Sequence, residues 1–93
     1  MKAGSYEKAI QLLTKQTLVK PVKPRLYMLL SKAYSLNKQP VQAHLAQAQF
    51  LKQLGDFTAA LAQLNIAKKE KPTIQELRQI EAELKNIKTK MPA

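Results

Sequence analysis

The chain has 93 residues, 16 of them Lys or Arg and 6 Asp or Glu, so its formal net charge is +10. Hydrophobic residues make up 45%, which is too many for a disordered chain and enough for one small domain with a modest core. With no Cys and one His, the sequence excludes disulfide scaffolds, Cys-based zinc sites and thiol nucleophiles. Its apolar runs are too short to span a membrane. We therefore expect a helical binding module with no cofactor of its own, rather than an autonomous enzyme.

Apolar residues recur at intervals of three and four along the chain, which is typical of amphipathic helices. Breaks that contain or adjoin Pro or Gly separate five such segments, and we expect helices over residues 5–18, 24–37, 40–54, 57–70 and 74–90. Pro21 and Pro24 bracket the first break between helices, because Pro lacks a backbone donor and disfavours helix at the residue before it. Pro40 suits the first turn of the third helix. Gly55 suits a left-handed helix end, and Asp56 can cap the helix that follows.

The fifth helix has the clearest start signal and the narrowest apolar stripe. Thr73 and Glu76 have the spacing of a capping box, which predicts a helix that begins at about Ile74. Its stripe consists of Ile74, Leu77, Ile80, Leu84, Ile87 and Met91. A stripe this narrow predicts a C-terminal capping helix that covers its neighbours on one side, and the alternative is a helix that docks another domain or a second copy.

An internal repeat is the strongest signal in the sequence. The pattern Gly4-x-Tyr6-x-x-Ala9 returns as Gly55-Asp-Phe57-x-x-Ala60, an offset of one and a half times the tetratricopeptide period of about 34 residues. Pro40-x-x-Ala43 stands between them. Small Ala residues suit helices that approach closely, and the large residues suit the gaps beside them. The positions that we expect to pack the repeats together are Gly4, Tyr6, Ala9, Tyr27, Leu30, Tyr34, Ala43, Gly55, Phe57, Ala60, Leu64 and Ala67.

On these residues the chain resembles a tetratricopeptide-type array over residues 4–72. Ser31 and Lys38 depart from that pattern, since both stand where Gly is usual. The resemblance implies a single all-α domain over residues 1–93, a solenoid of about five antiparallel helices. Because the pattern begins at Gly4, the first helix of that repeat would lie upstream, and we expect a fragment of a longer chain.

Four segments resemble a more specific family, namely Arg25–Tyr34, Gln42–Gln49, Leu54–Phe57 and Ala60–Leu64. They are similar to the C-terminal repeat region of bacterial beta-barrel assembly-enhancing proteases, which are periplasmic zinc metallopeptidases. The resemblance implies a periplasmic module that binds substrate or partner in outer-membrane protein quality control. It also implies that zinc belongs to an upstream protease domain, because this chain has no H-E-x-x-H motif and therefore no catalytic or zinc-ligating residue to match.

The sides of two helices that face away from the expected packing positions are candidates for a peptide-binding groove. These residues are Arg25, Met28, Lys32, Ser35, Gln42, Leu45, Gln49 and Lys52. They combine cations with a few apolar side chains, which favours a protein or peptide partner with acidic groups. The alternative interpretation is a solvent-exposed face without a ligand.

Positive charge is concentrated in the first half, where residues 1–54 hold nine Lys or Arg and one acidic residue. The exposed candidates are Lys15, Lys20, Lys23, Arg25, Lys32 and Lys38. They form either a surface for an acidic partner or a solubilising face. Lys outnumbers Arg fourteen to two, which argues against nucleic acid, because base and phosphate recognition favours Arg. A scaffold that forms a homodimer through its incomplete first repeat is the other alternative. His44 is expected to be a packing residue bonded to a neighbouring carbonyl, or else a contact to the upstream domain.

Overall fold

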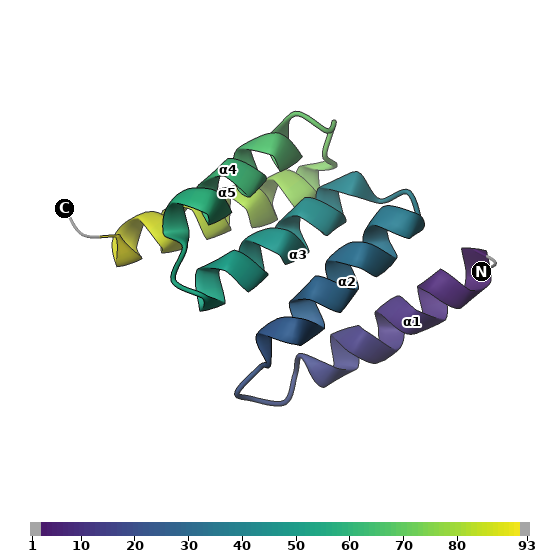
Figure 1. Ribbon diagram of the computed structural model, residues 1–93. Helices are drawn as coiled ribbons and strands as arrows, with labels where there is room; N and C mark the ends of the chain where they lie inside the picture. The colour runs from purple at the N-terminus through teal and green to yellow at the C-terminus, as the bar shows by residue number, and fades with distance from the viewer. Residues whose placement is uncertain (1–2, 92–93) are drawn as a thin grey trace.

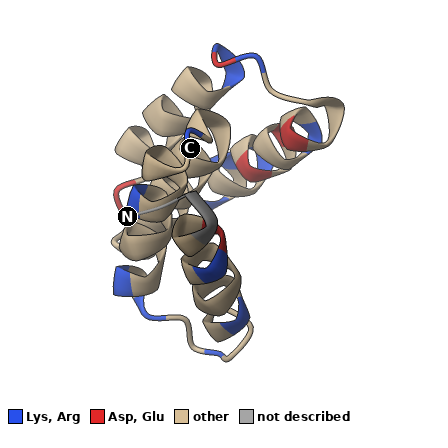
Figure 2. Ribbon diagram, turned by 90° about the vertical axis from the view of Figure 1, so that its right-hand side faces the viewer, with Lys and Arg blue, Asp and Glu red and all other residues tan. Residues whose placement is uncertain are grey.

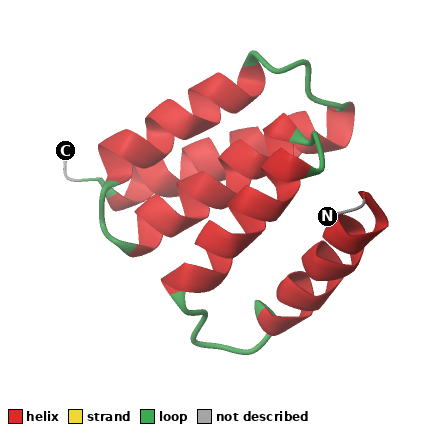
Figure 3. Ribbon diagram, turned by 45° about the vertical axis from the view of Figure 1, so that its right-hand side comes forward, coloured by secondary structure: helices red, strands yellow, loops and turns green. Residues whose placement is uncertain are grey.

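Five α-helices make up most of residues 3–91, which are the residues that the computed structural model describes. In chain order they are α1 (Ala3–Gln16), α2 (Pro24–Leu36), α3 (Pro40–Gln53), α4 (Phe57–Lys68) and α5 (Ile74–Lys90). No strand occurs in this part of the chain, and successive helices run antiparallel (Figure 1, Figure 3). The prediction of an all-helical chain with five helices is confirmed, and the predicted boundaries lie within two residues of the observed ones.

Local signals explain where the last two helices begin. The side chain of Asp56 accepts a hydrogen bond from the backbone N–H of Ala59 at 3.2 Å, which caps α4. At the start of α5, the Thr73 hydroxyl accepts from the Glu76 N–H at 3.1 Å, and the Glu76 carboxylate accepts from the Thr73 N–H at 3.0 Å. This reciprocal pair satisfies two of the free donors at the helix end, and it confirms the predicted capping box.

The turns after α2 and after α3 have the same backbone structure. Lys38 and Gly55 both adopt left-handed conformations, with φ of 59° and 83°. In each turn the next residue closes the helix end: the Gln39 N–H donates to the Tyr34 carbonyl at 2.9 Å, and the Asp56 N–H donates to the Leu51 carbonyl at 3.0 Å. Lys38 therefore occupies the position in its turn that Gly55 occupies in the turn after α3. Its backbone angle is one that L-residues rarely adopt.

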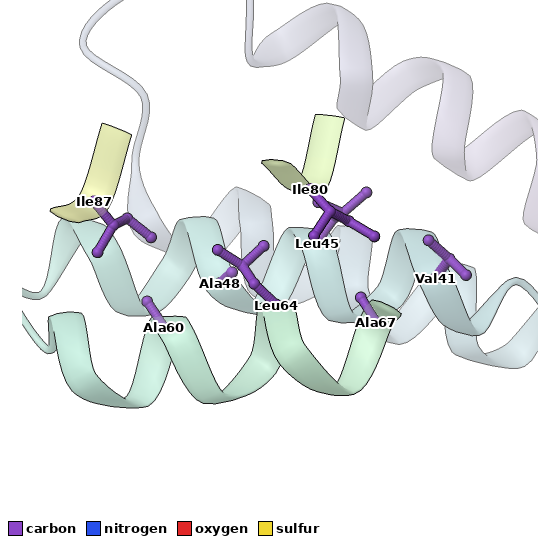
Figure 4. Close-up of a cluster of buried hydrophobic side chains, with 8 residues drawn as sticks. All are labelled: Val41, Leu45, Ala48, Ala60, Leu64, Ala67, Ile80 and Ile87. Carbon is purple, nitrogen blue, oxygen red and sulfur yellow. The ribbon is translucent and has the colours of Figure 1, made fainter. Parts of the chain in front are cut away.

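The core lies where α3 meets α4 and α5. α3 packs against α2, α4 and α5, whereas within the described residues α1 packs only against α2. Eight buried side chains form the main cluster shown in Figure 4: Val41, Leu45 and Ala48 of α3, Ala60, Leu64 and Ala67 of α4, and Ile80 and Ile87 of α5. Four of the six cluster residues on α3 and α4 are Ala or Val. Because these side chains are small, the two helices approach closely, and Leu64 fills the space between them.

The structure places the predicted packing positions at three levels of burial. Leu30, Ala43, Ala60, Leu64 and Ala67 are buried, whereas Tyr6, Ala9, Tyr27, Tyr34 and Phe57 are half-buried. Gly55 lies in an exposed turn. Gly4 lies inside α1, which begins earlier than predicted, and its packing falls outside the described side chains.

One member of the α5 stripe was placed wrongly. Ile74 is 74% exposed, because it is the first residue of α5 and precedes the turns that meet the core through Ile80 and Ile87.

Candidate functional site

The two halves of the predicted groove lie in different surroundings. Arg25, Met28, Lys32 and Ser35 are all exposed on α2. On α3, Gln42, Gln49 and Lys52 are half-buried, and Leu45 is buried in the main cluster. The prediction of an exposed Leu45 is wrong, because α5 covers the side of α3 that the sequence pattern treated as open to solvent.

A hollow of about 320 Å³ lies between α1, α2, α3 and α5, and we call it the central hollow. Its lining combines side chains from both predicted groups with residues of α5 that the sequence analysis did not single out. The lining residues are Thr14, Tyr27, Leu30, Tyr34, Gln42, Leu45, Ala46, Gln49, Gln79, Ala82 and Glu83. The face of α2 that was expected only to pack against other helices thus also forms a wall of this hollow, because α1 does not pack against α3 in the described part of the chain.

The chemistry of this lining suits an uncharged polypeptide segment. Tyr27, Leu30 and Tyr34 supply aromatic and aliphatic surface, while Gln42, Gln49 and Gln79 supply side-chain amides. The Gln42 amide donates to Glu76 at 3.0 Å and to the Gln79 side-chain oxygen at 3.4 Å, so it has its carbonyl oxygen to offer a ligand. Among the lining residues that the structure describes there is no Lys or Arg, and Glu83 is the one carboxylate. Acidic groups of a ligand would therefore pair with Lys or Arg side chains outside the central hollow rather than within it.

Polar contacts between α3 and α5 hold one edge of the central hollow in place. The Lys52 ammonium pairs with the Glu83 carboxylate at 3.1 Å, and the Gln42 amide donates to the Glu76 carboxylate at 3.0 Å. Lys52 was predicted as a cation for an acidic ligand, and in the structure it is already paired. Burial raises the pKa of the Tyr27 phenol, and the negative charge of Glu83 raises this pKa further, so Tyr27 stays a hydrogen-bond donor at neutral pH.

Glu83 and its neighbours on α5 could have been found from their spacing. Gln79, Ala82, Glu83 and Asn86 recur at intervals of three and four beside the apolar stripe, which is the mark of a second helix face. The Lys52 ammonium lies 3.4 Å from the Asn86 side-chain oxygen as well, so this face contacts α3. The apolar stripe of α5 by itself does not point to these residues.

His44 lies apart from the central hollow. Its side chain is half-buried on α3, and its Nδ1 lies 2.9 Å from the side-chain oxygen of Gln63 on α4. An amide oxygen accepts hydrogen bonds, so this contact is a hydrogen bond in the tautomer that carries the proton on Nδ1. This contact fits the expected packing role, although the carbonyl belongs to a Gln side chain rather than to the backbone.

The predicted basic residues are spread along one edge of the molecule. Lys15, Lys20 and Lys23 are exposed on or beside the α1–α2 loop, Arg25 and Lys32 are exposed on α2, and Lys38 is exposed in the following turn. In Figure 2 the α1–α2 loop and the adjoining helix ends carry Lys or Arg and no acidic residue.

Within residues 3–91, no three His, Asp or Glu side chains are grouped in a way that could hold a metal ion. None of the described helices has the length and apolar character needed to cross a membrane. Comparison with protein-family models, curated proteins and solved structures gives no match for this chain.

Proposed function

We propose that this chain is a polypeptide-binding module, built as a helical repeat of the tetratricopeptide type. The regular spacing of its helices supports the repeat, since α3, α4 and α5 begin at residues 40, 57 and 74. These equal intervals are half of the period of about 34 residues that the family repeats. The identical closure of the turns at Lys38 and Gly55 supports the same conclusion.

The central hollow is the observation that carries the binding function. It presents three amides beside an aromatic and aliphatic wall, and peptide ligands need both kinds of group, one for the main chain and one for side chains. Arg25 and Lys32 are exposed on the face of α2 that points away from the lining of the hollow, so they would attract only acidic groups of the polypeptide that extend beyond the hollow. The partner would then be bound by main-chain hydrogen bonds and apolar contacts, with acidic residues outside the hollow.

The resemblance to beta-barrel assembly-enhancing proteases supports a more specific proposal. The chain would be the part of a periplasmic zinc metallopeptidase that holds a substrate or partner during outer-membrane protein quality control. The catalytic zinc would belong to another domain. The role of this chain would be to hold a polypeptide without forming a covalent bond.

Blocking the central hollow tests this proposal. Ala82 lines the hollow and Ala62 lies on α4 outside it, and both are exposed on helices. The full chain, the Ala82→Trp variant and the matched Ala62→Trp variant would each capture proteins from a bacterial envelope extract, at low and at high salt. Circular dichroism would first establish that both variants are folded.

We expect Ala82→Trp to lower the recovery of bound polypeptides about tenfold or more, and Ala62→Trp to leave it unchanged, because only the first fills the binding space. Capture of outer-membrane assembly components at high salt would support the envelope assignment. Equal recovery by both variants would contradict binding in the central hollow, and recovery that vanishes at high salt would leave only non-specific attraction to a basic protein.

A further inference from the structure

The α1–α2 loop, residues 17–23, holds two apolar side chains that the fold does not use. Leu18 is 76% exposed and Val19 is 71% exposed, whereas Val22 in the same loop is buried, with 8% of its surface exposed. Nine large apolar side chains of the described residues are exposed, but Leu18 and Val19 are the two neighbours in sequence among the three that are more than 70% exposed. Adjacent exposed apolar side chains can mark an interaction site.

The loop backbone is held in place, which keeps these side chains pointing outward. The Gln53 amide of α3 donates to the Val22 carbonyl at 2.9 Å and anchors the second half of the loop. In the first half, the Leu18 N–H donates to the Lys15 carbonyl at 3.1 Å, and the Val19 N–H donates to the Gln16 carbonyl at 3.3 Å.

The surroundings of the loop are positively charged without compensation. Lys15, Lys20, Lys23 and Arg25 are exposed on both sides of Leu18 and Val19. The sequence has no acidic residue between Glu7 and Asp56, and Figure 2 shows the loop with blue segments and no red. An uncompensated cluster of cations attracts an anionic surface.

The shape of this region favours a lipid surface over an acidic polypeptide. The loop forms a corner of the molecule, where α1 ends and α2 begins (Figure 1). A hollow lined by Gln16, Val19, Pro21, Lys23 and Leu26 lies beside the loop, while Leu18 lies outside it with 76% of its surface exposed. An apolar side chain exposed beside Lys residues can enter the boundary of a bilayer, where it reaches the acyl region while the Lys side chains reach the lipid phosphates. A folded acidic protein would need a matching concave surface to cover Leu18.

We propose that the α1–α2 loop binds the surface of membranes that contain anionic lipid. Leu18 and Val19 enter the headgroup boundary, while Lys15, Lys20 and Lys23 contact lipid phosphates. This interaction is peripheral, and it is independent of whether the central hollow binds a polypeptide.

Fluorescence gives a direct test, because the chain contains no Trp. Leu18→Trp places a single reporter at the loop, and Ile74→Trp places one at a position that is equally exposed, at 74%, at the beginning of α5. Each variant would be titrated with phosphatidylglycerol-containing vesicles and with vesicles of phosphatidylcholine alone.

We expect the emission of Leu18→Trp to shift to shorter wavelength with the anionic vesicles only, and the emission of Ile74→Trp to stay unchanged. A shift of both reporters, or of neither, would overturn the proposal. An equal response to uncharged vesicles would overturn it as well, because the cations would then have no role.

Charge variants separate this loop from the net charge of the protein. Lys20→Gln combined with Lys23→Gln removes two exposed cations at the loop, and Lys68→Gln combined with Lys69→Gln removes two exposed cations beyond α1–α3. We expect the first pair to weaken vesicle binding about tenfold or more and the second to weaken it much less. Equal losses would overturn the proposal. Binding of polyglutamate by the loop reporter without binding of anionic vesicles would assign the loop to acidic polypeptides instead.

Discussion

Lys38 is one of two described non-Gly residues, with Lys71, whose left-handed backbone angle conflicts with local preference. Its φ of 59° is left-handed, which costs an L-residue about 1–2 kcal/mol, while Gly adopts this angle freely. Gly55 occupies the equivalent place in the next turn at φ of 83°, and a Cβ added there would meet nothing within 4 Å. A substitution at Gly55 therefore changes the free energy of unfolding through the backbone angle and not through a clash of the new side chain.

We expect Lys38→Gly to raise the free energy of unfolding by about 0.5–1 kcal/mol and Gly55→Ala to lower it by about 1 kcal/mol. Urea denaturation of each variant measures both values. Lys38→Ala serves as the control, because it removes the charge and keeps the Cβ, so it should give no comparable gain. A gain as large for Lys38→Ala would mean that charge repulsion, rather than backbone angle, destabilises this turn.

At the scale of the element, α5 is part of the core as well as a cover for it. The side chains of Ile80 and Ile87 are fully buried among residues of α3 and α4, and Glu76 and Glu83 bond to α3. A helix that only solvated the end of a repeat would not hold two of the three largest fully buried side chains. The wall of the central hollow that α5 provides is thus fixed by the packing of the core.

A pair of Ile→Ala variants tests this role of α5. We expect Ile80→Ala to lower the free energy of unfolding by about 2–5 kcal/mol, because it leaves a cavity in a closely packed site. Ile74→Ala changes the same side chain at an exposed position and should cost less than about 1 kcal/mol. Thermal and urea unfolding give both differences, and similar small effects of the two substitutions would mean that α5 is only loosely attached.

At the scale of the whole molecule, stability should be uneven along the chain. Between Ser5 and Gln16 no side chain of α1 is buried, and in the described structure this helix packs only on α2. α3, in contrast, packs against three helices and contributes three residues to the main cluster. Local opening is governed by such differences in buried contact.

Hydrogen exchange followed by mass spectrometry measures this difference. We expect amides of α1 to exchange at least about tenfold faster than amides of α3, because α1 can detach while α3, α4 and α5 stay folded. α2 serves as the internal comparison, with protection between the two. Uniform protection across α1, α2 and α3 would instead indicate that all five helices unfold in one cooperative step.

The positions of the helices could be predicted from the sequence because they depend on neighbouring residues. Thr73 and Glu76 are three positions apart, and their reciprocal hydrogen bonds mark the start of α5 without help from the rest of the chain. Pro40 and Asp56 mark the starts of α3 and α4 in the same local way. The burial of Ala60, Leu64 and Ala67 also follows from their spacing on one face of a helix.

The central hollow depends on contacts between residues far apart in the chain, and only the tertiary structure decided them. Lys52 and Glu83 are 31 positions apart, and Gln42 and Glu76 are 34 positions apart. A local pattern shows which face of α3 is polar or apolar, but it does not show that α5 will cover that face. The separation of α1 from α3 leaves Tyr27 and Tyr34 half-buried at the wall of the hollow for the same reason. Periodicity defines the faces of a helix, and packing decides which of them meet.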